Sequence, residues 1–254
     1  SRGALMWTFL HGFTGSPQSY SRIVRHLDVE QQALIPALTG HGDDWRGRAA
    51  DSFEGEVSRL LALHSGVKRP RLLCGYSLGA RAALGMLSRA PEMFDGALLI
   101  GLHPGLESPS ARQERRALDA GRARLLREHG LAAFVKEWEV LPLFASQRAL
   151  PPNLLAEQRG FRLAHDPEGL ARSLEVLGLA EMPNYRPAMA SLAVPITLMT
   201  GSLDSKFSNM ANELADQNVH IRAERVDGVG HNVLLEAPAV VAAALADVAE
   251  LAQR

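Results

Sequence analysis

The sequence has little cysteine, no long apolar run and almost no net charge, and each shortage excludes a class of protein. A single cysteine, Cys74, among 254 residues excludes an internal disulfide framework and fits a reducing compartment. No run reaches the roughly 18 apolar residues of a membrane span, so stable membrane insertion is not expected. The formal net charge of -1 gives no general reason to expect a nucleic acid partner. With no signal-like segment at the start, we expect a soluble, cytoplasmic protein.

Short apolar runs alternate along the chain with helix-like segments. Apolar residues make up 46% of the sequence and charged residues 22%, which is ordinary for a globular protein with a sizeable core. Strands that alternate with helices need crossover connections, so the pattern predicts an α/β fold with a mostly parallel twisted sheet and helices on both faces. The expected strands lie in the runs ALMWTFL, ALIPAL, RLLCGY, GALLIGL, PITLMTG and VHIRAERV.

The segment from residue 103 to residue 186 breaks this alternation. It contains helical stretches separated by proline and glycine, and it has no convincing strand. We therefore predict a core built from residues 1–102 and 187–254, with residues 103–186 inserted as a helical cap. Arginine is frequent in the cap, but acidic residues nearly match it, so the cap is not a basic stripe of the kind that binds nucleic acid.

The motif GYSLG, at residues 75–79, lies where an apolar run meets a helical pattern. A strand that turns sharply into a helix can expose one side chain at the turn, and small residues on either side relieve the crowding. Gly75 and Gly79 flank Ser77 in this way, which is typical of a nucleophile elbow. The alternative is an ordinary strand-to-helix turn in which Ser77 only caps the helix.

Two further residues follow in the chain order that such a serine requires. Asp204 comes after the fifth apolar run, and His231 comes after the sixth in a glycine-flanked loop. Because the carboxyl ends of parallel strands meet at one edge of a sheet, we expect Ser77, Asp204 and His231 to form a catalytic triad. Taken singly, Asp204 could be a turn residue and His231 a surface histidine.

The loop HGFTG follows the first apolar run and faces the same edge. Its backbone N–H groups are candidates for an oxyanion hole, which stabilises negative charge as it develops on a substrate. We predict that the N–H groups of Phe13 and Leu78 form this hole, and that His11 has a structural role.

These features resemble the α/β-hydrolase superfamily over essentially the whole chain. Within it, the stretches HGFTGS, GYSLGAR, WEVLPLFASQ and GSLDSKF are similar to the 2-succinyl-6-hydroxy-2,4-cyclohexadiene-1-carboxylate synthases (SHCHC synthases), lyases of menaquinone biosynthesis. The resemblance implies pyruvate elimination from a small polycarboxylate substrate, with a His-activated serine as base. It implies no cofactor and no obligate protein partner. The histidines also lack the spacing of metal ligands, so no metal is expected.

The resemblance also implies roles for residues around the serine. Arg81 lies four positions after Ser77 on one helix, so both side chains share a face, and its guanidinium could pair with a substrate carboxylate. Arg116 is the alternative to Arg115, one position away. The implied substrate-binding residues are Tyr76, Arg81, Arg115, Trp138, Arg159 and Lys206. The arginines could instead be solvated or salt-bridged, Lys206 could be an ordinary loop lysine, and Trp138 could be a core residue.

Two other functions stay open from the sequence. The same triad could hydrolyse a carboxylic ester or a carbon–carbon bond through an acyl-serine. A binding protein on an inactive hydrolase fold is disfavoured, because serine, acid, histidine and oxyanion loop are all present.

Overall fold

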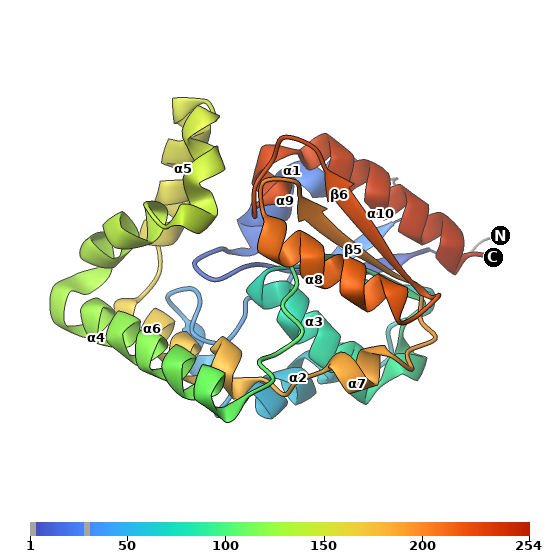
Figure 1. The fold of residues 1–254 in the computed structure, drawn as a ribbon, viewed down its shortest axis with the longest axis horizontal. Coiled ribbons are helices and arrows are strands. Elements are labelled where there is room, and N and C mark those ends of the chain that lie inside the picture. Colours follow the sequence, from blue (N-terminus) through green and yellow to red (C-terminus); the bar gives the residue numbers. More distant parts are fainter. Residues whose placement is uncertain (1–3, 28–30) are drawn as a thin grey trace.

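Six parallel strands form one sheet at the centre of the protein (Figure 1). The computed structural model describes residues 4–27 and 31–254. The strand order is β2-β1-β3-β4-β5-β6, and every neighbouring pair is parallel, which confirms the predicted sheet. The strands are β1 (Met6–Leu10), β2 (Gln32–Leu34), β3 (Arg71–Tyr76), β4 (Gly96–Ile100), β5 (Ile196–Gly201) and β6 (Ile221–Val226).

Helices cover both faces of the sheet, as the alternation predicted. One face packs against α2 (Phe53–Ala62), α3 (Leu78–Arg89) and α8 (Ser205–Asp216). The opposite face packs against α1 (Ser21–Val24) and α10 (Pro238–Ala252). The shorter elements of this part are η1 (Pro17–Tyr20), η2 (Trp45–Arg48), η3 (Pro91–Met93) and α9 (Val233–Glu236).

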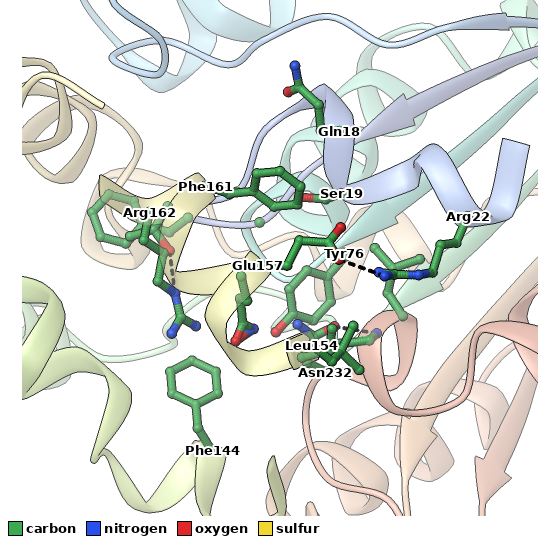
Figure 2. A pocket seen from close by; sticks show the side chains of 17 residues that line it. Gln18, Ser19, Arg22, Tyr76, Phe144, Leu154, Glu157, Phe161, Arg162 and Asn232 are labelled. Atoms are coloured by element: carbon green, nitrogen blue, oxygen red, sulfur yellow. Dashed lines mark hydrogen bonds and ion pairs between the residues drawn. The ribbon is translucent and has the colours of Figure 1, made fainter. Parts of the chain in front are cut away.

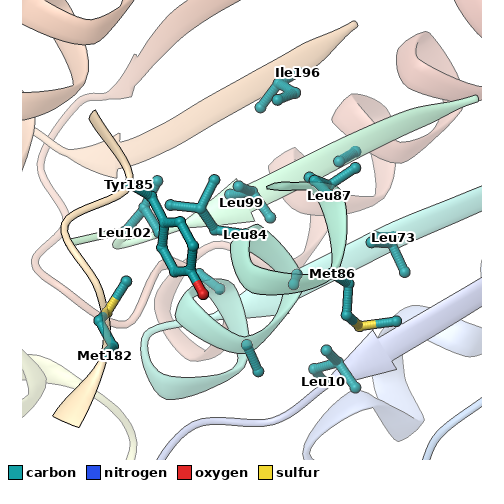
Figure 3. Close-up of a cluster of buried hydrophobic side chains, with 14 of the residues drawn as sticks. Leu10, Leu73, Leu84, Met86, Leu87, Leu99, Leu102, Met182, Tyr185 and Ile196 are labelled. Carbon is teal, nitrogen blue, oxygen red and sulfur yellow. The ribbon is translucent and has the colours of Figure 1, made fainter. Parts of the chain in front are cut away.

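The core has two halves because side chains on a strand point alternately to opposite faces. On β3, Leu73 joins the cluster under α3, whereas Leu72 and Cys74 join the cluster under α10. Figure 3 shows the first cluster, with Leu84 of α3 close to Leu99 of β4. This packing holds β3 and α3 rigidly on either side of the turn that carries Ser77.

A block of helices separates β4 from β5 in the chain. In Figure 1, α4 and α6 lie side by side, and α5 stands apart from the sheet. Gly130, with φ 83°, introduces a kink into α4. The elements of this block are α4 (Pro109–Glu139), η4 (Pro142–Ala149), α5 (Pro152–Leu163), α6 (Pro167–Leu177), η5 (Leu179–Glu181) and α7 (Arg186–Met189). Within the described ranges, none of the helices combines the length and apolar character that crossing a membrane requires.

Candidate active site

Ser77 lies in a sharp turn between β3 and α3. Its backbone has φ 51° and ψ -107°, a conformation that residues other than glycine rarely adopt. The turn brings the flanking residues very close to other backbone atoms. A Cβ atom on Gly79 would lie 2.0 Å from the carbonyl oxygen of Leu10, and one on Gly75 would lie 2.4 Å from that of Gly79. Glycine is therefore required at both positions for sheet and helix to approach so closely.

Three side chains from distant segments form a hydrogen-bonded line at this turn. The Nε2 atom of His231 lies 3.1 Å from Ser77 Oγ, and its Nδ1 atom lies 2.7 Å from Asp204 Oδ2. The carboxylate of Asp204 accepts a hydrogen bond from Nδ1–H, which leaves Nε2 free to accept the proton of the serine hydroxyl. His231 and Asp204 are both buried. The structure thus brings together the three residues predicted from chain order.

The loops that carry the acid and the histidine hold each other in place. The N–H of Leu203 donates to the carbonyl of Val229 at 3.0 Å, and the N–H of Ser202 donates to that of Val226 at 2.8 Å. The aromatic ring of Phe207 packs against the imidazole of His231, with 4.6 Å between the ring centres. These contacts limit the rotation of the imidazole and preserve its hydrogen bonds.

Phe13 and Leu78 lie beside Ser77 in the same cleft. Leu78 is the first residue of α3, so its N–H points away from the helix and has no partner within it. Neither backbone N–H has a protein acceptor in the part of the chain that the structure describes. Both donors are therefore available to an oxygen atom of a substrate.

An open cleft surrounds Ser77 and is rich in positive charge. The acidic residues in its lining are Asp119 and Asp204, of which Asp204 is already engaged with His231. A low-dielectric cleft with excess positive charge favours an anionic ligand. The cationic residues in the lining are Arg81, Arg115, Arg122 and Lys206.

Arg81 extends from α3 into the cleft, as its spacing from Ser77 predicted. Its guanidinium donates to the carbonyl of Leu177 at 2.7 Å. Burial lowers the pKa of Arg81 to about 9, with the positive charge of Arg115 as a smaller cause and Asp119 acting against both. Arg81 therefore stays charged at neutral pH, and a carboxylate beside Ser77 would relieve this unfavourable environment.

Arg115 faces the cleft, whereas its neighbour Arg116 does not. The Nε atom of Arg115 lies 3.3 Å from the buried carboxylate of Asp119, which also accepts from Arg122 at 3.1 Å. Arg116 instead pairs with Glu181 at 2.7 Å and is largely exposed. Successive helical residues lie about 100° apart, so only one of the two can face inward.

Arg159 is not part of the cleft, and here the structure departs from the prediction. Its side chain is 59% exposed and pairs with Glu139 at 2.6 Å. The inward arginine of α5 is Arg162, whose Nε donates to Thr14 Oγ1 at 3.2 Å and whose guanidinium lies over the ring of Phe144. Arg162 comes three residues later, near the end of α5 that packs against the oxyanion loop.

A second, partly open pocket adjoins the cleft, and the two share Phe13, Tyr76 and Phe144. Figure 2 shows Arg162 and Phe144 on its cap side and Arg22 near its opposite end. Arg22 pairs there with Glu157 of α5 at 2.6 Å. The phenol of Tyr76 is buried between the two spaces, and this burial raises its pKa, so the phenol stays neutral.

Trp138 forms an aromatic wall of the cleft. Its ring stacks on Phe134 and meets Phe13 edge-on, with ring centres 5.6 and 5.3 Å apart. The guanidinium of Arg122 lies 5.1 Å from the indole centre. The indole Nε1 is buried and has no hydrogen-bond partner among the described residues. A buried donor of this kind is costly unless a ligand supplies an acceptor.

Lys206 lies exposed on the first turn of α8, where it lines the cleft. Its charge acts on His103, another residue that lines the cleft. Burial is the main cause that lowers the pKa of His103 to about 3, and Lys206 is the next largest. His103 is therefore neutral and contributes no charge to the cleft.

Several cleft residues escaped the sequence analysis, chiefly Arg122, Asp119, Phe144 and Phe207. Phe144 and Phe207 stand in the FASQ and DSKF stretches. These motifs are the signal from which the two aromatic residues could be predicted. Within the described ranges, no group of three metal-ligating side chains is placed to hold an ion.

Comparison with known proteins agrees with this geometry. The alpha/beta hydrolase family matches residues 9–244. The 2-succinyl-6-hydroxy-2,4-cyclohexadiene-1-carboxylate synthase of Salmonella schwarzengrund (strain CVM19633) is 34% identical over 257 residues, covering 98% of this chain and 95% of that protein. The chain belongs to the SHCHC synthase family of α/β hydrolases.

Two solved structures resemble this SHCHC synthase family member to different degrees. The structure of MenH from S. aureus has a TM-score of 0.94 at 26% identity, covering 100% of this chain and 96% of that one. A thermophilic esterase from Thermogutta terrifontis has a TM-score of 0.83 at 22% identity, covering 98% and 91%. The second likeness concerns the fold alone.

Proposed function

We propose that the protein is a lyase. It eliminates pyruvate from 2-succinyl-5-enolpyruvyl-6-hydroxy-3-cyclohexene-1-carboxylate and gives 2-succinyl-6-hydroxy-2,4-cyclohexadiene-1-carboxylate, a step of menaquinone biosynthesis. The observation that carries the proposal is the pairing of Ser77 with His231 inside a cleft lined by four cationic side chains. A hydrolase of simple esters needs the pair but not the cations. An enzyme that acts on a substrate with several carboxylates needs both the pair and the cations.

In the proposed reaction, Ser77 acts as a base, and His231 activates it by accepting the hydroxyl proton. The hydroxyl proton moves to His231 Nε2 while Ser77 Oγ takes the proton from ring carbon 2, next to the succinyl ketone. A double bond forms between carbons 2 and 3, the existing one moves to carbons 4 and 5, and the bond from carbon 5 to oxygen breaks. The enolpyruvate that leaves takes up a proton on carbon and becomes pyruvate. Asp204 stabilises the imidazolium during the transfer.

The remaining groups have roles in binding and charge stabilisation. In the transition state, negative charge develops on the ketone oxygen, where the N–H groups of Phe13 and Leu78 would stabilise it by about 3 kcal/mol each. Arg81, Arg115 and Lys206 would hold the carboxylates so that the ring proton points at Ser77 Oγ, which is catalysis by positioning. Tyr76 and Trp138 would enclose the ring.

We further propose that residues 103–186 act as the cap that closes this site. The helices between β4 and β5 supply Arg115, Arg122 and Trp138 to the cleft, which supports the division. A small-molecule substrate needs neither a protein partner nor a cofactor for this chemistry. The single, buried Cys74 supports a cytoplasmic location.

The experiment is to mix the purified protein with the enolpyruvyl intermediate. Pyruvate release and the absorbance of the conjugated diene are then followed together. We expect both to rise in a one-to-one ratio, with no stable acyl-enzyme. Accumulation of an acyl-serine with neither product would assign the protein to the ester or carbon–carbon-bond hydrolases.

Arg81 offers a matched pair of variants on one helix. Arg81→Ala removes a cleft cation, whereas Arg89→Ala removes a surface arginine of α3 that pairs with Glu54 outside the cleft. We expect Arg81→Ala to lower kcat/KM by about 10- to 100-fold, the range for losing one charge-assisted hydrogen bond. Arg89→Ala should leave kcat/KM unchanged. Equal effects of the two variants would contradict a binding role for Arg81.

A further inference from the structure

Thr14 adopts a backbone conformation that a β-branched residue rarely tolerates. Its φ is 67°, and it follows directly after Phe13 in the oxyanion loop. Such strain persists only when the surrounding structure imposes it. Thr14 is buried, and all three of its hydrogen-bonding groups are engaged.

The groups that engage Thr14 come from two other segments. Its N–H donates to His41 Nε2 at 3.1 Å. Its carbonyl accepts from His165 Nε2 at 2.9 Å, and its hydroxyl accepts from Arg162 at 3.2 Å. His165 and Arg162 both belong to the block inserted between β4 and β5. The cap therefore holds the backbone of the oxyanion loop directly.

The hydrogen bonds show which nitrogen of each imidazole carries the proton. His41 accepts at Nε2, so its proton lies on Nδ1, 3.2 Å from the carbonyl oxygen of Thr39. His165 accepts from the N–H of Gly42 at Nδ1, at 3.0 Å, so its proton lies on Nε2 and points to Thr14. Both rings are neutral, and each joins two backbone segments. Their ring centres lie 5.2 Å apart.

The peptide unit that contains the Phe13 N–H is also fixed by a hydrogen bond on its Gly12 side. The carbonyl oxygen of that unit is Gly12 O, which accepts from His11 Nδ1 at 2.8 Å. His11 in turn accepts from the N–H of Leu38 at 3.0 Å. With Gly12 held before Phe13 and Thr14 held after it, the direction of the Phe13 N–H has little freedom.

We propose that His165 and His41 are positioning residues for the oxyanion hole: they hold Thr14 in its left-handed conformation and so aim the Phe13 N–H at the developing negative charge. The inference rests on the oxyanion role given to Phe13 under the proposed function. It assigns the cap a part in the chemical step as well as in substrate binding. A residue of this kind changes kcat more than KM, because the donor acts mainly in the transition state.

The test uses a reaction that needs the oxyanion hole but not the natural substrate. A fluorophosphonate reacts with an activated serine, and the phosphoryl oxygen then occupies the oxyanion hole. We expect His165→Leu to slow the labelling of Ser77 by about tenfold or more, the size of a misplaced oxyanion donor. His165→Gln, which keeps an N–H donor near the position of Nε2, should restore most of the rate.

The matched control is another buried, neutral histidine, whose hydrogen bonds lie outside the oxyanion loop. His64 bonds to Thr8 Oγ1 at 2.8 Å and to the carbonyl of Leu60 at 2.9 Å, so His64→Leu removes a similar pair of bonds. It should lower the unfolding temperature but not the labelling rate. Labelling of His165→Leu at the wild-type rate, or an equal slowing in His64→Leu, would overturn the inference.

A measurement on the unchanged protein covers the case in which a variant fails to fold. Nitrogen-15 NMR of the imidazoles at pH 7 should show the proton on Nδ1 of His41 and on Nε2 of His165. The opposite tautomer on either ring would break a bond to Thr14 and overturn the inference. Absence of pyruvate elimination by a protein that labels normally would refute only the proposed function.

Discussion

At the scale of single residues, the site depends on unusual backbone conformations. Thr14 and Ser77 are the non-glycine residues with positive φ in the described ranges, and both lie at the proposed oxyanion hole. Gly101, at the end of β4, has φ 64° and lies under the imidazole of His231. At Thr14 and Ser77 such a conformation costs about 1–3 kcal/mol per residue, and the packed sheet and helices offset it. The cost is concentrated where donors and the nucleophile must be aimed.

Gly101→Ala should displace the catalytic imidazole. A Cβ atom at this position would lie 2.8 Å from His231 Cε1, so the ring must shift from the position in which it bonds Ser77 Oγ. We expect kcat to fall by about tenfold or more, since misplacing a catalytic group by about 1 Å costs up to about a hundredfold. Steady-state kinetics of pyruvate release measure the change.

Gly66→Ala is the control for this substitution. Gly66 has φ 75°, but a Cβ atom there would meet nothing within 4 Å. Both variants should lose about 1 kcal/mol or more of stability from backbone strain. Only Gly101→Ala should lose activity. A fully active Gly101→Ala would contradict the close packing assigned to His231.

At the scale of elements, five strand ends and several helices of the inserted block converge on the site. The loops after β1, β3, β5 and β6 carry the oxyanion donors, the serine, the acid and the histidine. This convergence could be predicted, because the carboxyl ends of parallel strands meet at one edge and the chain order is that of the fold. The orientation of α5 could not, since Arg159 and Arg162 lie on one amphipathic helix. Only its packing against Thr14 and Phe144 makes Arg162 the buried one.

Two variants of α5 should therefore behave differently. Arg162→Ala removes a buried guanidinium that bonds Thr14 and packs on Phe144, so we expect a loss of about 1–3 kcal/mol in the free energy of unfolding. Arg159→Ala removes an exposed guanidinium whose ion pair with Glu139 is screened by solvent, so we expect a clearly smaller loss. Urea denaturation measures both. Equal losses would contradict the orientation of α5.

At the scale of the whole molecule, neutral histidines are buried throughout the fold. Burial is the first cause that lowers the pKa in each case, to about 4 for His11 and about 3 for His103. The positive charges of Arg48 and Arg59 act in the same direction on His11. The other buried histidines with a lowered pKa are His41, His64 and His165. The sequence contained these histidines but no sign of their burial, which depends on tertiary packing.

Stability should therefore decrease as the pH falls below about 6.5, the pKa of an unfolded histidine. The unfolded chain binds protons there, whereas the folded chain does not until the pH reaches the lowered values. Each such histidine contributes at most about 1.4 kcal/mol per pH unit in this window. The full stability is present above about pH 7. Urea denaturation between pH 7 and pH 5 measures the slope.

His64→Gln and His129→Gln provide the comparison for this slope. His64 is buried, so His64→Gln should reduce the dependence on pH by up to about one proton. His129 is exposed on α4, so His129→Gln is the control for the loss of an imidazole that is not buried. A free energy of unfolding that is constant from pH 7 to pH 5 would refute the neutral, buried state of these side chains.

The most direct test of Ser77 as a base uses substrate that carries deuterium on ring carbon 2. In a single turnover, the account predicts a primary isotope effect on pyruvate release, an unchanged mass for the Ser77 peptide during the reaction, and loss of the reaction in Ser77→Ala. Pyruvate release without an isotope effect, or a substrate fragment bound covalently to Ser77, would contradict it.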